Sequence, residues 1–173
     1  MSGARISIVH ADITTLDVDA IVNAANSRLI PGGGVDGAIN KAAGPELGKA
    51  MMAIGRCPTG QAVITPGFKL KARYVVHTVS PIFSQHEESD VWRLLTDCYR
   101  NSLTLAAENA ARSIAFPSLG TGVYGIPIKR ACGFAVAQAA EHLRSGSAIE
   151  SVIFCCFSAG DAALYRAALD GLN

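Results

Sequence analysis

The order in which strand-like and helix-like segments alternate constrains the fold of this chain more than any other feature of its sequence. Segments typical of strands cover residues 5–10, 19–22, 61–65, 74–79, 113–116 and 150–157. Segments typical of helices cover residues 35–43, 45–53, 127–143 and 162–172, and the clearest helix begins at Ser89 or Asp90. This alternation predicts an α/β domain with helices on both faces of a largely parallel sheet. A chain of 173 residues suits a single domain over residues 1–173.

Composition excludes several classes of protein. Half of the residues are hydrophobic and 17% are charged, which is typical of a globular domain. The net charge is +1 and Lys and Arg form no cluster, so we do not expect RNA as a partner. The N-terminus lacks the layout of a signal peptide, and no apolar run is long enough to span a membrane. We therefore expect a cytoplasmic protein without a membrane partner.

The cysteines and histidines predict neither disulfides nor a metal site. The five cysteines are an odd number without a CxxC pair, and the histidines are dispersed. We expect the cysteines to be reduced packing residues, with the adjacent Cys155 and Cys156 pointing to opposite faces of a sheet. We expect no cofactor and no metal.

Two glycine-rich segments dominate the functional interpretation. The first, PGGGVDG at residues 31–37, contains Gly33, Gly34 and Val35 and opens a helix. The second, GTGVYG at residues 120–125, lies between a strand and a helix. Both match GxGxxG, in which glycines let the backbone approach a phosphate and a helix N-terminus supplies partial positive charge.

These segments do not fit an ordinary Rossmann dinucleotide site. The first lies far from its strand, and neither is followed about twenty positions later by an acid suited to a ribose. The chain also lacks GxxxxGK[ST], which excludes a P-loop kinase or ATPase. Ligands bind at the carboxyl ends of strands in such sheets, so the two segments could instead clamp a diphosphate between them.

Polar residues near the first segment have two interpretations each. Asn23 and Asn26 could bind ribose hydroxyls, or they could serve turns and helix caps. Asp36 could be a general base that orients water, or its negative charge could interact favourably with the helix dipole. Asp12 could cap a turn or accept a hydrogen bond from an adenine amine.

Two further candidates carry less weight. His77 lies in the middle of an apolar strand without a Cys or Ser placed to form an evident triad, which favours a structural histidine. Ser118 is not a nucleophile elbow, because Phe116 stands where that motif requires glycine.

In combination, the motifs are highly specific. They are DI at 12–13, DAIVNAAN at 19–26, GGGVDGAI at 32–39, AAGP at 42–45, CPTG at 57–60, VHTV at 76–79, and FP at 116–117 followed by GTGVYG. The sequence resembles a macrodomain of the group with O-acetyl-ADP-ribose deacetylase activity, over most of the chain. The resemblance implies a three-layer α/β/α sandwich around a mixed, mostly parallel sheet.

The resemblance also implies a role for individual residues. Asp12 would recognise the adenine amine, the Ile13 backbone would contact the base, and Phe157 would stack on it. Gly34 and Val35 would approach the diphosphate and the distal ribose. Asn26 would form hydrogen bonds with the distal ribose. Asp36 matches the proposed base. The diphosphate would be wrapped by the backbone of Gly120, Thr121, Gly122, Val123 and Tyr124.

The implied activity is hydrolysis of O-acyl-ADP-ribose to ADP-ribose and a carboxylate, with removal of mono-ADP-ribose from Asp or Glu of proteins as a related activity. The alternative is a module that binds ADP-ribose or ADP-ribosylated proteins without turnover. Asn26 and Asp36 together favour the enzyme, whereas Asn40, where the nearest deacetylases often have His, slightly favours the reader. Other departures from the family pattern are Ala11, Ser80 and Ser158.

Overall fold

Six strands form the centre of the part of the chain that the computed structural model describes, residues 5–172. They are β1 (Arg5–His10), β2 (Ala20–Ala24), β3 (Ala62–Pro66), β4 (Tyr74–Thr78), β5 (Ser113–Phe116) and β6 (Ser151–Cys156). They make one sheet in the order β1-β6-β5-β2-β4-β3, in which only β3 is antiparallel to its neighbour. The predicted largely parallel sheet is confirmed, and the carboxyl ends of its parallel strands share one edge.

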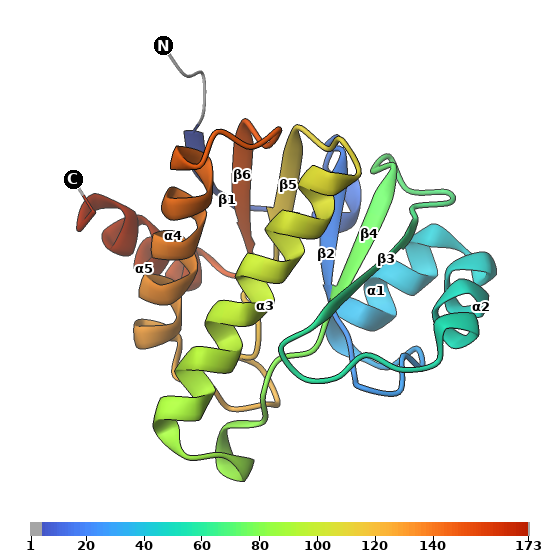
Figure 1. The fold of residues 1–173 in the computed structure, drawn as a ribbon, viewed down its shortest axis with the longest axis horizontal. Helices are drawn as coiled ribbons and strands as arrows, with labels where there is room; N and C mark the ends of the chain where they lie inside the picture. The colour runs from blue at the N-terminus through green and yellow to red at the C-terminus, as the bar shows by residue number, and fades with distance from the viewer. Residues whose placement is uncertain (1–4, 173) are drawn as a thin grey trace.

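Helices cover both faces of this sheet. They are α1 (Gly34–Ala43), α2 (Pro45–Ile54), α3 (Glu88–Glu108), α4 (Ile128–Arg144) and α5 (Ala159–Asp170), with 3-10 turns η1 (Ile13–Thr15) and η2 (Phe83–Gln85). Figure 1 shows α3 and α4 across one face with α5 beside α4, whereas α1 and α2 lie behind the strands β4 and β3. The predicted three-layer α/β/α sandwich is confirmed. Within residues 5–172, no helix combines the length and hydrophobicity that crossing a membrane requires.

Local chemistry sets the helix boundaries. Gly44, with a φ of +89°, ends α1, and Pro45 then occupies the first position of α2, where its missing N–H leaves no bond unmade. The helix α5 begins at Ala159, three residues before the predicted start. The reason is Ser158, whose hydroxyl accepts a hydrogen bond from the N–H of Asp161 at 3.1 Å and caps the helix.

Two hydrophobic clusters, one on each face of the sheet, hold the layers together. The cluster under α3, α4 and α5 contains Tyr99, Phe116 and Phe154, whose ring centroids lie 5.0 to 6.1 Å apart. The cluster under α1 and α2 contains Ile39 and Leu47, both fully buried. Cys156 belongs to the first cluster and Cys155 to the second, as their alternation predicted, and all five cysteines are free and buried.

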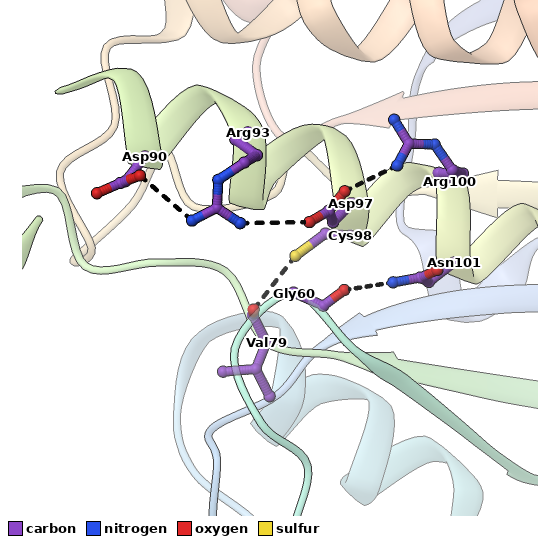
Figure 2. A network of polar contacts seen from close by, with 8 residues as sticks. All are labelled: Gly60, Val79, Asp90, Arg93, Asp97, Cys98, Arg100 and Asn101. Atoms are coloured by element: carbon purple, nitrogen blue, oxygen red, sulfur yellow. Dashed lines mark hydrogen bonds and ion pairs between the residues drawn. The ribbon is translucent and has the colours of Figure 1, made fainter. Parts of the chain in front are cut away.

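The helix α3 also fixes the backbone that leads to the carboxyl end of the sheet (Figure 2). The amide of Asn101 donates to the carbonyl of Gly60 at 2.7 Å, and the thiol of Cys98 donates to the carbonyl of Val79 at 3.2 Å. Neighbouring ion pairs join Arg93 and Arg100 to carboxylates of the same helix, but they are exposed, and such pairs contribute at most about 1 kcal/mol. The bonds to Gly60 and Val79 therefore matter more, because Val79 comes just before Ser80 and its carbonyl also accepts from the N–H of Gly60 at 2.9 Å.

Candidate functional site

A cavity of about 1180 Å³ opens at the carboxyl edge of the sheet. Its walls come from the residues that follow β1, β2, β5 and β6 and from the start of α1. This is where ligands bind in open α/β sheets, because successive loops and helix N-termini converge there. The structure places nearly all of the predicted site residues on this wall: Asp12, Ile13, Asn26, Gly33, Gly34, Val35, Asp36, Gly120, Thr121, Gly122, Val123, Tyr124 and Phe157.

Asn23 is the exception, because it does not line the cavity. The strand β2 extends to Ala24, so Asn23 lies inside the sheet rather than in the loop after it, and its side chain is fully buried. Its amide nitrogen donates to Oδ1 of Asp36 at 2.9 Å. The predicted contact between Asn23 and a ribose therefore does not fit the structure, which places Asn23 behind Asp36.

Asp36 is the buried carboxylate of the site. It lies in the first turn of α1, is 4% exposed, and forms part of the cavity wall. Its Oδ2 accepts a hydrogen bond from the N–H of Gly32 at 3.1 Å, and its Oδ1 accepts one from the amide of Asn40 at 2.8 Å as well as that from Asn23. Burial raises the pKa of Asp36 above its ordinary value, and the hydrogen bonds from Asn23, Gly32 and Asn40 oppose that rise.

Asn40 is a second side-chain donor to Asp36. Its amide nitrogen donates both to the carboxylate of Asp36 and, at 3.0 Å, to the backbone carbonyl of the same residue. It lies one turn after Asp36 on α1 and does not itself line the cavity. Where the deacetylases that the sequence resembles often have an imidazole, this chain carries a hydrogen-bond donor that does not titrate.

The first glycine-rich segment packs tightly against α1. A Cβ atom on Gly37 would come within 2.7 Å of the Gly32 carbonyl oxygen, so only glycine permits this approach. Asn26, just before this segment, fulfils the turn role that was one of its two interpretations. Its Oδ1 accepts from the N–H groups of Arg28 and Ile30, both at 3.2 Å, its amide nitrogen donates to the carbonyl of Ile30 at 2.6 Å, and the residue also lines the cavity.

The second glycine-rich segment forms another part of the cavity wall. Gly120 has a φ of +76°, and its carbonyl accepts a hydrogen bond from the N–H of Ile126 at 3.0 Å, which closes the loop. The N–H groups of residues 121–124 donate to no protein acceptor within residues 5–172, and all four residues line the cavity. Successive free backbone N–H groups of this kind form a concave site that favours an anion.

The cavity wall carries both exposed apolar residues and acidic residues. Phe157 is 95% exposed and Val123 is 99% exposed, although both are large hydrophobic residues. Asp12 lies nearby on the wall and caps η1, its carboxylate accepting from the Thr14 N–H at 3.0 Å. Asp161, which the sequence interpretation missed, also lines the cavity. The signal was available, because Ser158 stands where an acid often follows Phe157 and Asp161 comes three residues later in the first turn of α5.

His77 is fully buried, as a structural histidine should be, but its neighbours are polar. Its Nδ1 lies 3.0 Å from the amide nitrogen of Asn23, and its Nε2 lies 2.9 Å from the hydroxyl of Thr65. Burial lowers the pKa of His77 to about 4. The imidazole is therefore neutral at physiological pH.

We expect this histidine to make the stability of the protein depend on pH. The unfolded chain binds a proton at His77 below about pH 6.5, whereas the folded protein does so only below about pH 4. The stability that neutral His77 contributes to folding is therefore fully present above pH 6.5 and is lost as the pH falls towards 4. At about 1.4 kcal/mol per pKa unit, the loss over that window is about 3 kcal/mol. Urea unfolding at pH 7 and pH 4.5 measures it, and His77→Leu should flatten the difference.

Comparisons with known proteins agree with this architecture. The Macro domain family model matches residues 22–135. A Macro domain-containing protein of Ralstonia nicotianae is 56% identical over 162 residues, which cover 94% of this chain and 92% of that protein. An O-acetyl-ADP-ribose deacetylase of Citrobacter rodentium is 48% identical over 167 residues, which cover 94% of each. The Oceanobacillus iheyensis macrodomain with ADP has a TM-score of 0.90 and 43% identity, covering 95% of this chain and 90% of that one. The chain therefore belongs to the Macro domain family.

Proposed function

We propose that this protein binds ADP-ribose and hydrolyses acyl esters of its distal ribose, releasing ADP-ribose and a carboxylate. One observation carries the proposal. A buried carboxylate, Asp36, is held by three hydrogen-bond donors on the wall of a cavity that is also lined by free backbone N–H groups of residues 121–124. The first feature suits activation of water, and the second suits a diphosphate that fixes the substrate in place.

The cavity suits an elongated ligand with one apolar and one anionic section. Phe157 offers a flat apolar surface for a purine, and Asp12 can accept a hydrogen bond from its exocyclic amine. The loop from Gly120 to Tyr124 would surround the diphosphate. The distal ribose would then lie near Asn26 and Asp36, at the N-terminus of α1.

Hydrolysis follows from this placement. Asp36 accepts a proton from a water molecule whose oxygen attacks the acyl carbon, and negative charge develops on the acyl oxygen beside backbone N–H groups. The bond between the acyl carbon and the ribose oxygen then breaks. The ribose oxygen takes up the proton from Asp36, and the products are the carboxylic acid and ADP-ribose. Positioning of water and ester supplies much of the rate, because the reaction uses no protein nucleophile.

The nucleophile candidates near the cavity support direct attack by water. Cys155 lines the cavity, but burial raises the pKa of its thiol, which donates to the carbonyl of Ala11 at 3.1 Å. The hydroxyl oxygen of Ser118 accepts hydrogen bonds from Thr121 at 2.8 Å and Tyr165 at 2.9 Å. Neither side chain has a histidine among its hydrogen-bond partners in residues 5–172. An activated nucleophile needs such a base.

Hydrolysis in ¹⁸O-labelled water tests this proposal. The protein is incubated with O-acetyl-ADP-ribose, and mass spectrometry follows acetate and ADP-ribose. Attack on the acyl carbon places one ¹⁸O atom in acetate and leaves the ribose oxygen unlabelled. Calorimetric titration with ADP-ribose runs alongside. Binding of ADP-ribose without release of acetate would instead make the protein a reader of ADP-ribose.

A related substrate deserves a separate assay, because an ADP-ribosyl group on Asp or Glu is also attached through an ester. A peptide that carries mono-ADP-ribose on a glutamate replaces O-acetyl-ADP-ribose in the same reaction. The same carboxylate and water would release free ADP-ribose and the unmodified peptide. A peptide that stays modified while O-acetyl-ADP-ribose is consumed would restrict the activity to small esters.

We expect Phe157→Ala to weaken ADP-ribose binding without destabilising the fold. The ring is 95% exposed, so its removal uncovers little of the core. Loss of stacking on a base corresponds to about 1–3 kcal/mol, a weakening of roughly 5- to 150-fold. Calorimetry with ADP-ribose measures the loss, and Phe157→Trp serves as the control because it keeps an aromatic surface. An unchanged dissociation constant in Phe157→Ala would show that the adenine of ADP-ribose does not stack on Phe157.

A further inference from the structure

A row of buried polar side chains crosses three adjacent strands behind Asp36. Asn23 on β2 pairs in register with His77 on β4, and His77 pairs in register with Val63 on β3. Thr65 lies two residues beyond Val63 and so occupies the same face of the sheet. Asn23 and His77 are fully buried and Thr65 is 4% exposed. The row leads directly to Asp36 on α1.

The chemistry of the groups fixes the direction of each hydrogen bond in this row. An amide nitrogen can only donate, so Asn23 donates one N–H to Oδ1 of Asp36 and the other to Nδ1 of His77. Because Nδ1 accepts, the proton of the neutral imidazole lies on Nε2, which donates to the hydroxyl oxygen of Thr65.

This arrangement leaves one polar atom unsatisfied. The Oδ1 of Asn23 is buried and has no hydrogen-bond partner within residues 5–172. Turning the amide over would place that oxygen against a carboxylate oxygen of Asp36, which is repulsive. The carboxylate therefore sets the orientation of the amide, in which its second N–H faces Nδ1 of His77.

From this geometry we infer that His77 and Thr65 are positioning residues for Asp36. Thr65 accepts from Nε2 and holds the imidazole in place, His77 accepts the second N–H of Asn23, and Asn23 holds the carboxylate of Asp36 at the cavity wall. Neither His77 nor Thr65 touches the cavity. The inference rests on the proposed function in that it assigns Asp36 a catalytic role.

Within residues 5–172, no charged group forms a hydrogen bond with Asp36, so its ionised form is stabilised by neutral N–H donors. Lys41 on α1 and Glu46 and Lys49 on α2 are exposed, and His77 is the titratable group that the sheet places behind Asp36. The titratable groups that share the cavity wall, without a hydrogen bond to Asp36, are His10, Asp12, Tyr124, Cys155 and Asp161.

The test compares His77→Leu with His77→Asn. Leu removes the acceptor for Asn23, whereas the side-chain oxygen of Asn can take the place of Nδ1. The matched control is Val76→Ala, a fully buried residue on the same strand whose side chain points to the opposite cluster. The readouts are the carbon-13 chemical shift of the Asp36 carboxyl group against pH, without ligand, and kcat and KM for O-acetyl-ADP-ribose.

We expect His77→Leu to move the titration midpoint of Asp36 upwards, because the Asn23 amide loses the acceptor that holds it and then stabilises the ionised carboxylate less well. The acidic limit of kcat should move with it, and kcat at neutral pH should fall about tenfold, the effect of one lost hydrogen bond to a charged group, with KM unchanged. His77→Asn and Val76→Ala should titrate at the wild-type pH. Thr65→Val should show a smaller shift of the same sign, and Thr65→Ser should reverse it.

A folded His77→Leu protein in which Asp36 titrates as in the wild type would overturn the inference. Replacing a merely structural histidine would lower the stability of the protein and leave the titration of Asp36 unchanged. If His77→Leu does not fold, the same outcome in Thr65→Val decides the question. The NMR titration needs no substrate. Absence of turnover in the wild type would therefore refute the proposed function without affecting the test of His77.

Discussion

Asp36→Asn should lower kcat for O-acetyl-ADP-ribose hydrolysis by about 100- to 1000-fold, within the range of a lost general base, while ADP-ribose still binds. Asparagine has nearly the same shape, and its side-chain oxygen can still accept from Asn23 and Asn40. Its amide cannot take a proton from water. Single-turnover assays with the ester and calorimetry with ADP-ribose separate the two effects.

The fold should survive this substitution. Burial raises the pKa of Asp36, so the folded protein holds its proton more tightly than the unfolded chain does. Any stabilisation from this group is therefore present below the unfolded pKa of 3.8 and is lost as pH rises through the folded value. At neutral pH a neutral side chain avoids this loss, although its amide faces the N–H of Gly32.

Asp161→Asn is the matched control for Asp36→Asn, because it removes a carboxylate from the same cavity and has no hydrogen bond to Asp36. We expect it to leave kcat unchanged. If Asp36→Asn turned over ester at the wild-type rate, Asp36 would not be the base, and activation of water would have to come from the substrate or the backbone.

Gly120→Ala should weaken ADP-ribose binding at least about tenfold, because each lost hydrogen bond to a charged phosphate is worth about 1.5–3 kcal/mol. The backbone has a φ of +76°, a conformation that costs a non-glycine residue about 1–3 kcal/mol. The new Cβ would also lie 2.4 Å from Cδ1 of Ile126 and 3.2 Å from Cβ of Ser80. Ile126 is 2% exposed and has little room to move, so the loop must shift.

Gly133→Ala is the control for Gly120→Ala. Gly133 lies within α4, where an added Cβ would meet nothing within 4 Å, so alanine should stabilise the protein by about 0.5–1 kcal/mol through its helix preference. Urea unfolding and calorimetry on both variants measure stability and affinity. Affinity retained in Gly120→Ala would mean that the diphosphate does not depend on the shape of this loop.

The sequence predicted the fold class, and all of the predicted site residues except Asn23 lie on the cavity wall. Hydrophobic periodicity reports which face of an element is buried, and glycine, proline and capping residues report where elements end, and both signals are local. Parallel strands then bring their following loops to one edge, so the segments at residues 31–37 and 120–125 could be expected to face one another. The start of α5 was predicted three residues late, because Ser158 was judged by family pattern and not as a cap.

Only the tertiary structure decided what surrounds Asp36. Asn23 and His77 are 54 positions apart, and Thr65 and His77 meet only because β3 turns back antiparallel beside β4. Asn23 holds a carboxylate because β2 extends through it and turns its side chain into the interior. The partner of a polar side chain depends on strand order and register, which arise from the packing of the whole sheet. The sequence can identify Asp36 as a candidate catalytic residue, whereas the fold determines which amides and which imidazole surround it.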